Sequence, residues 1–294
     1  MGFIDLHIHS KYSDGKCTLN ELLDMALKNN VSVLSLTEHY NLSSLYLARK
    51  LVKTNEKYKN IEIVPGIEIG AKLDGFGLSK KHVCHILAYY VSNKIYSVLK
   101  EYETDRKSTN ERIICILNNA GIPISYKKVY KFSRKESIGR YDIAKYLADK
   151  GYVHNIEEAY FKYLDYGQMA HVERKKMSPQ VLIKAIISCG GVPVIAHPKS
   201  LKLNPYDLDE FIKMLVDCGL AGIELYNPRM KEQDFLVYNE IVKKYNLIGT
   251  VGSDFHKIGG EVQIGLGIDN NLCISDYSII QKLKEVKHSI DFKN

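Results

Sequence analysis

Six of the ten histidines and three carboxylates of this 294-residue sequence stand at short apolar runs. The runs are IDLHIHS, LSLTEH, VPGIE, HVCHILA, VPVIAHP and TVGSDFH. Residues two apart on a β-strand point the same way, so His7 and His9 can bind one ion. The remaining members are Asp14, in the loop after the first run, and His39, Glu68, His85, His197, Asp254 and His256. Such nitrogen and oxygen ligands favour divalent ions such as zinc, manganese or iron.

The size of this set distinguishes it from ordinary buried histidines. A lone His-X-His pair is commonly a hydrogen-bonded core pair, but here ligand-type residues recur at six separate apolar runs. One ion takes about four to six ligands, so we expect two or three divalent metal ions (Mn, Fe or Zn). Adjacent ions generate hydroxide from a bridging water near neutral pH and stabilise the oxygens of a phosphate ester under attack. The set therefore predicts a metal-dependent phosphoesterase.

The elements that must position these residues alternate between strand and helix at both ends of the sequence. Helical patterns such as LNELLDMALKNN follow the strand-like runs up to residue 98, and the alternation resumes at VPVIAHP. Between them, residues 99–190 read as helical nearly throughout. Because barrel chemistry gathers at the C-terminal ends of strands, we predict an α/β barrel in residues 1–98 and 191–294, interrupted by a helical insertion lobe at 99–190.

Charge separates the predicted lobe from the predicted barrel. Residues 99–190 hold 17 Lys and Arg against 11 Asp and Glu, whereas the remaining residues hold 24 against 23. A basic lobe attracts anionic substrates and offers arginine forks for phosphate, although most single lysines are better explained as solvated surface. Four basic residues are instead predicted to bind substrate, because they lie in or beside breaks between helices. They are Arg134, Arg140, Arg174 and Lys175.

The motifs HIHS with YSDG, TEH, PGIE, AHP and GSDFH, in this order, resemble those of the PHP (polymerase and histidinol phosphatase) family from about residue 3 to 258. The resemblance implies a distorted seven-stranded (β/α) barrel with up to three metal ions. It assigns His7, His9, Glu68 and Asp254 to one ion, Glu68, His85 and His197 to a second, and Asp14, His39 and His256 to a third. The family usually reads TDHD where this chain has Thr37-Glu38-His39-Tyr40.

The predicted lobe adds a second resemblance. Gly139-Arg140, DKGYV and EEAYFKYLDYGQMAHVERKKMSP are similar to a PHP subfamily that acts on 3',5'-bisphosphate nucleotides and on the 5' end of short RNA. The resemblance implies that Arg140 binds a substrate phosphate. The subfamily usually continues with Pro-His, where this chain has Tyr141-Asp142.

The expected reaction is hydrolysis of a nucleotide phosphomonoester, or of a terminal RNA phosphodiester, by a metal-bridging hydroxide. Asp254 and His256 are the predicted catalytic residues, with His256 or a metal-bound water protonating the leaving alcohol. Arg140, with Arg174 or Lys175, holds a second phosphate. The alternatives are a sugar-phosphate or cyclic ribose phosphate hydrolase, a histidinol phosphatase and an RNA-binding module without catalysis. No glycine-rich loop of the Walker or Rossmann kind is present.

Composition is that of a globular enzyme, with 45% hydrophobic and 26% charged residues. No apolar run of about 18 residues and no signal segment appears, so we expect a cytoplasmic protein that does not bind a membrane. We also expect no obligate protein partner. The substrate is its expected partner. Six cysteines without a Cys-X-X-Cys pair predict reduced, buried thiols.

Overall fold

The computed structural model describes residues 2–73, 83–133 and 138–293. The chain divides into two compact units. The first unit comprises Met1–Tyr96 with Met177–Asn294, and the second comprises Ser97–Lys176. The predicted division at residues 98 and 190 stays a prediction. The predicted substrate residue Arg134 lies outside the described residues.

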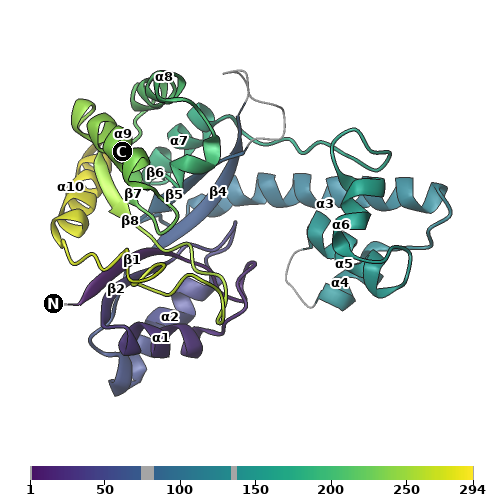
Figure 1. Ribbon diagram of the computed structural model, residues 1–294, viewed down its shortest axis with the longest axis horizontal. Coiled ribbons are helices and arrows are strands. Elements are labelled where there is room, and N and C mark those ends of the chain that lie inside the picture. The colour runs from purple at the N-terminus through teal and green to yellow at the C-terminus, as the bar shows by residue number, and fades with distance from the viewer. Residues whose placement is uncertain (1, 74–82, 134–137, 294) are drawn as a thin grey trace. The chain divides into compact units, whose positions relative to one another are not determined.

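The first unit alternates strands and helices (Figure 1). Its strands are β1 (Phe3–Ile8), β2 (Val31–Leu36), β3 (Glu62–Ile63), β4 (Gly66–Lys72), β5 (Val83–Tyr89), β6 (Val192–Ile195), β7 (Gly222–Tyr226) and β8 (Ile248–Val251). Its helices are α1 (Leu19–Lys28), α2 (Ser43–Thr54), α7 (Pro179–Ser188), α8 (Pro205–Val216), α9 (Glu232–Lys244) and α10 (Ser278–Lys293), with short 3₁₀ turns at Glu56–Tyr58 and Pro198–Leu201.

The described strands form two sheets. One has the order β1-β2-β3 and is parallel, and the other has the order β4-β5-β6-β7-β8, in which β5 runs antiparallel to both neighbours. Isolated bridges join the sheets at two places, Ile8 to Phe255 and His39 to Glu68. The fold is therefore mixed α/β. The seven-stranded barrel that the resemblance implies is not confirmed by sheets of three and five strands.

Apolar side chains from both sheets share one core. Ile4 and Leu6 of β1 pack in the same cluster as Leu87 of β5 and Val194 of β6. These strands are buried along most of their length, including the polar Asp5 and His7 of β1, as expected for strands covered on both faces. Helix α10 covers β6 and β8 with Leu283 and its neighbours. This core fixes the strand ends that carry the ligand-type residues.

Local sequence signals fix where the helices of the first unit begin. The Thr18 hydroxyl accepts a hydrogen bond from the Glu21 amide while the Glu21 carboxylate accepts one from the Thr18 amide, a capping box at the start of α1. Helix α7 begins with Ser178 as its N-cap and Pro179 in its first turn. Both signals satisfy or remove backbone donors that a helix start leaves unpaired.

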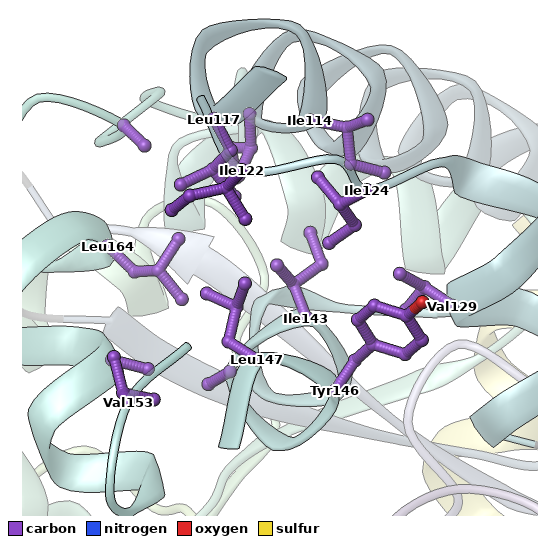
Figure 2. Packing of buried hydrophobic residues seen from close by; sticks show 14 of the residues in the cluster. Ile114, Leu117, Ile122, Ile124, Val129, Ile143, Tyr146, Leu147, Val153 and Leu164 are labelled. Carbon is purple, nitrogen blue, oxygen red and sulfur yellow. The ribbon is translucent and has the colours of Figure 1, made fainter. Parts of the chain in front are cut away.

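The regular structure described in the second unit is helical. It comprises α3 (Ile95–Asn119, which begins in the first unit), α4 (Tyr126–Ser133), α5 (Arg140–Asp149), α6 (Ile156–Ala159) and a π-helical turn at Tyr160–Leu164. Figure 2 shows its core, where Leu117 and Ile122 meet Ile143 and Leu147 of α5. The unit thus has a hydrophobic core of its own.

The cysteine environments differ from the prediction at one clear position. Cys17, Cys84 and Cys189 are buried, whereas Cys115 is exposed. The neighbours Ile113 and Ile114 take the inner face of α3, and the 100° step of the helix turns Cys115 away from them. The prediction of a buried thiol was wrong for Cys115. No helix within residues 2–73, 83–133 and 138–293 is long and apolar enough to cross a membrane.

Replacing Leu147 by alanine should destabilise the protein by about 2–5 kcal/mol, because it opens a cavity in the core of the second unit. The side chain is fully buried. Urea unfolding followed by circular dichroism measures the change. The same substitution at Leu236, which is 57% exposed, is the control and should cost less than about 0.5 kcal/mol. Equal losses at both positions would contradict this packing.

Candidate metal centre

Glu68 is the central carboxylate of the predicted ligand set. It lies inside β4 rather than at the end of a strand, and its side chain is 1% exposed. Its two oxygens face imidazole nitrogens from several elements. Oε1 lies 3.0 Å from His85 Nδ1 and 3.0 Å from His197 Nε2, and Oε2 lies 3.2 Å from His9 Nε2, 3.3 Å from His39 Nδ1 and 3.5 Å from His7 Nε2. A carboxylate shared in this way is placed to bridge two cations.

Imidazole nitrogens also face one another in this centre. His7 Nε2 lies 3.1 Å from His9 Nε2, and His85 Nδ1 lies 3.3 Å from His197 Nε2. A nitrogen lone pair facing another needs a proton or a cation between them. With ligand bonds of about 2.0–2.2 Å, two donors on one ion lie about 3.0–3.5 Å apart. The residues therefore fit divalent ions.

The two aspartates complete the outer part of the set. Asp254 Oδ1 lies 3.5 Å from His9 Nε2 and 3.6 Å from His7 Nε2. Asp14 Oδ1 lies 3.5 Å from His256 Nε2, and its Oδ2 lies 3.6 Å from His39 Nε2. All nine predicted ligands thus converge. Three groups have donors within 4.8 Å of one another, namely His7-Glu68-His197, His7-His9-Asp254 and His9-Asp14-His39. The assignment of ligands to ions stays a proposal.

Strand direction explains how His85 joins residues that follow strands. His85 is the third residue of β5, and β5 runs antiparallel to β4 and β6. The beginning of β5 therefore lies at the edge of the sheet where the parallel strands end. In β1, two residues between Asp5 and Ile8 oppose one residue of β2. This bulge contains His7, and bulges commonly re-aim side chains beside active sites.

Two of the candidate ligands occupy left-handed backbone conformations. The φ angles are 26° at His197 and 55° at Asp254, and Tyr40, next to His39, has 57°. Non-glycine residues rarely adopt such angles, which cost about 1–3 kcal/mol each and cluster at functional sites. Surrounding bonds hold these positions. The Asp254 amide donates to the His7 carbonyl at 2.8 Å, and the Tyr40 hydroxyl accepts from the Gly70 amide at 3.1 Å.

The charges of the centre shift its pKa values in opposite directions. Burial alone lowers the pKa of His9, but bonds to Asp254 and Glu68 raise it to about 10. Burial lowers the pKa of His39 to about 4, with Glu68 opposing the shift. Burial raises the pKa of Glu68, but His85 and His39 hold it well below its usual range. Protons and cations therefore compete for the same nitrogens, and metal affinity should rise with pH.

Glu38, which stands where the resembling family has aspartate, is fully buried beside this set. Its carboxylate accepts a hydrogen bond from the Ser10 amide at 3.1 Å and further bonds from the Ser10 and Ser13 hydroxyls. Ser10 and Ser13 belong to the turn between His9 and Asp14. The Glu38 side chain, one methylene longer than aspartate, thus holds the turn that precedes the candidate ligand Asp14.

Glu224 of β7 is a buried carboxylate that sequence reasoning missed. It is fully buried, accepts from His7 Nδ1 at 2.8 Å and accepts from the His197 amide at 2.6 Å. A bond to Nδ1 leaves His7 Nε2 with its lone pair toward the centre. A Cβ on Gly252 would lie 2.3 Å from the Glu224 carboxylate, so glycine is required there. The signal was a carboxylate in the apolar run GIELY, the pattern that identified Glu68.

Asp5 was also missed. Its side chain is fully buried and accepts from the amides of Ser253 at 2.9 Å and Gly265 at 2.8 Å. Burial raises its pKa to about 6, against the lowering effect of the Ser253 bonds. Asp5 thus ties β1 to the segment that carries Asp254 and His256.

The described substrate-binding candidates lie in the second unit. Arg140 begins α5 and donates from Nη2 to the Val172 carbonyl at 2.7 Å, while its Nε is buried without a hydrogen-bond partner among the described residues. Arg174 Nε lies 3.6 Å from Asp105. The side chain of Lys175 is exposed. Burial lowers the pKa of Arg140, and Arg174 lowers it further although Tyr160 opposes both effects.

Two cations beside Arg140 were not predicted. Burial lowers the pKa of Lys176 to about 8, and Arg174, Arg140 and Arg106 lower it as well. Arg106 lies against Gly139, since a Cβ there would be 2.9 Å from its Nη2. These four side chains form a cationic cluster within the second unit.

The acid that departs from the resembling subfamily has a structural place. Asp142 is 4% exposed and accepts a hydrogen bond from the Gly139 amide at 2.8 Å, at the start of α5. A carboxylate in this position satisfies a free backbone donor and favours the positive end of the helix dipole. Tyr141 is 46% exposed.

The sequence matches the PHP domain over residues 5–286. It is 28% identical over 265 residues to a 5'-3' exoribonuclease of Haemophilus influenzae, covering 90% of this chain and 94% of that protein. It is 26% identical to a phosphoribosyl 1,2-cyclic phosphate 1,2-diphosphodiesterase of Eggerthella lenta, covering 90% and 98%. It is also 26% identical to a 3',5'-nucleoside bisphosphate phosphatase of Chromobacterium violaceum, covering 88% and 89%.

Solved structures share the fold. A putative metal-dependent phosphoesterase of Bifidobacterium adolescentis superposes with a TM-score of 0.74 at 21% identity, covering 95% of this chain and 94% of that one. An amidohydrolase of Chromobacterium violaceum superposes with a TM-score of 0.72 at 24% identity, covering 95% and 96%.

Replacing Glu224 by glutamine should weaken metal binding about 10- to 100-fold, since it removes the carboxylate that orients His7. Metal content after dialysis against a graded series of free zinc or manganese measures the loss. Glu240→Gln, at a carboxylate 74% exposed on α9, is the matched control and should leave metal affinity unchanged. Unchanged affinity in the Glu224 variant would mean that the carboxylate has no part in ordering the ligands.

Proposed function

Because the chain belongs to the PHP family and is a metal-dependent phosphoester hydrolase, we propose that it removes phosphate from 3',5'-bisphosphate nucleotides. The 5' end of short RNA is the second proposed substrate. The observation that carries the hydrolytic part is the Glu68 carboxylate, whose oxygens each face imidazole nitrogens at 3.0–3.5 Å. The names of the Haemophilus and Chromobacterium relatives support the substrate class.

Divalent ions held by the nine ligands would acidify an attacking water and neutralise the phosphoryl oxygens. The chain itself holds the ligands in place. His256 Nδ1 donates to the Asp254 carbonyl at 2.8 Å, which leaves Nε2 to act either as an ion ligand or as the atom that exchanges a proton with the leaving alcohol, but not as both. Asp254 remains ionised, since His7 and His9 hold its pKa below the usual range despite burial. A distorted seven-stranded barrel remains part of this proposal, supported by the bridges that join the two sheets.

The cationic cluster of the second unit is by itself suited to bind an anionic group such as a phosphate. Arg140 has a buried Nε without a hydrogen-bond partner among the described residues, although most buried donors are paired. A phosphate oxygen would satisfy it, and guanidinium groups bind phosphate with two parallel bonds. We assign the second phosphate to Arg140 and Arg174.

A cyclic ribose phosphate is the second candidate substrate. The Eggerthella relative named for that reaction is as similar to this chain, at 26%, as the bisphosphate phosphatase. Histidinol phosphate and RNA binding without catalysis remain weaker alternatives. The complete ligand set argues against the last, because a module that only binds RNA has no need of nine converging ligands.

Metal-reconstituted protein should release phosphate from adenosine 3',5'-bisphosphate with manganese, and Asp254→Asn or His197→Ala should lower kcat at least about 100-fold, since each removes a ligand of the centre. Phosphate release measures both. His288→Ala, at an exposed histidine on α10, should keep full activity. Cleavage of a cyclic ribose phosphate but not of the bisphosphate would instead support the second candidate.

Arg140→Met should raise KM for adenosine 3',5'-bisphosphate about 10- to 100-fold, because a charge-assisted phosphate contact is lost. A substrate with a single phosphate, p-nitrophenyl phosphate, should be hydrolysed nearly as well as before. Initial rates with the two substrates measure the difference. Lys145→Met, at an exposed cation on the same helix, is the control. Equal losses with both substrates would argue against a role in binding a second phosphate.

A further inference from the structure

An arginine of the first unit lies beside the candidate metal centre and was in none of the predicted sets. Arg229 follows β7 in the segment Tyr226-Asn227-Pro228-Arg229, at the strand ends that carry the ligands. Its Nη1 lies 3.8 Å from Asp254 Oδ2. Both residues belong to the first unit, so this proximity is a feature of that unit by itself.

The two oxygens of Asp254 face different groups. Oδ1 lies 3.5–3.6 Å from His9 and His7 nitrogens, in the ligand set. Oδ2 faces Arg229. The Asp254 carboxylate therefore lies between the Arg229 guanidinium and the histidine nitrogens where cations fit. A phosphoryl group bound to those cations would come within reach of the same guanidinium.

The backbone that carries Arg229 is fastened by side chains. Its amide donates to the Asn227 side-chain oxygen at 3.0 Å, and its carbonyl accepts from Lys199 Nζ at 3.3 Å. Asn271 donates to the neighbouring Pro228 carbonyl at 2.7 Å. A backbone held this way does not have to be reordered when the side chain binds a ligand.

The same segment is linked to the ligands through Glu224. The Asn227 amide group donates to Glu224 Oε2 at 3.1 Å, while Oε1 accepts from His7 Nδ1 at 2.8 Å. One buried carboxylate thus sets both the orientation of a metal ligand and the segment that bears Arg229. An arginine that served only to cover the surface would not require its backbone to be linked to a candidate metal ligand.

The ion pair with Asp254 does not account for the residue. The Arg229 side chain is 58% exposed and the contact is 3.8 Å long, and exposed pairs of this kind contribute little to stability. The described part of the chain gives this guanidinium no other ion pair or side-chain hydrogen bond. More than half of the Arg229 side chain is exposed, so it is accessible to a ligand at the centre.

We propose that Arg229 binds the phosphoryl group hydrolysed at this centre, an inference that rests on the proposed phosphoester hydrolysis. Its guanidinium donates to a phosphoryl oxygen and stabilises the negative charge that grows there during displacement. The ligand class is any phosphomonoester or diester accepted by the centre, together with its phosphate product, which is inorganic phosphate when the substrate is a monoester. Arg229 is thereby distinct from Arg140 and Arg174, which we assign to the second phosphate.

The test compares Arg229→Met and Arg229→Lys with the wild-type protein after manganese loading. Calorimetric titration with inorganic phosphate should show affinity for phosphate lowered about tenfold or more in Arg229→Met. With p-nitrophenyl phosphate, kcat/KM should fall about 100-fold. Metal content and melting temperature should be unchanged. Arg229→Lys should recover part of both losses, because it keeps the charge without the fork.

Arg112→Met, at an exposed arginine of α3, is the matched control and should behave as wild type. Phosphate affinity and kcat/KM within twofold of wild type in Arg229→Met would overturn the inference. A loss of bound metal proportional to the loss of activity would also overturn it, because Arg229 would then act by positioning Asp254. A wild-type protein without hydrolysis of any phosphoester would reject the proposed function, and the phosphate titration would still decide whether Arg229 binds phosphate.

Discussion

The buried carboxylate of Glu68 is the constraint around which the first unit is organised. A charge removed from water is costly unless opposite charges or hydrogen-bond donors surround it. Glu68 meets this requirement with histidines from β1, from the segments after β2 and β6, and from β5. Its own backbone pairs with the segment of His39 and joins the two sheets. The ligand set and the sheet junction therefore depend on one residue.

Strained backbone angles and three further buried carboxylates also hold the candidate ligands in place. His197 and Asp254 hold positive φ angles, and each is secured by a hydrogen bond involving β1 or Glu224. Glu38, Asp5 and Glu224 are fully buried acids that face backbone amides, hydroxyls or a ligand imidazole. Their oxygens accept bonds from these donors, which holds the segments of the candidate ligands in place.

The convergence of the candidate ligands could be anticipated because their pattern is local. His7-X-His9 and Asp254-X-His256 are visible as pairs, Asp14 follows in a loop, and each other candidate stands at an apolar run. What surrounds them depends on contacts distant in sequence. The hydrogen bond between His7 and Glu224 joins residues 217 positions apart, and no periodicity encodes it. The antiparallel direction of β5 and the position of Glu68 inside β4 likewise follow from sheet pairing. Lys176 and Arg106 were missed because their meeting with Arg140 depends on how helices of the second unit pack.

The division of the first unit into two stretches of chain has a consequence for its synthesis. Six of the nine ligands precede Ser97 and three follow Lys176. Glu68 is 129 residues ahead of His197, and β5 must wait for β6 to pair. At about 5–20 residues per second on the ribosome, the interval is roughly 6–26 s. During that time the second unit, which has its own core, emerges complete. The nascent first unit therefore passes through a stage in which Glu68 and five other candidate ligands have been made and the remaining three have not.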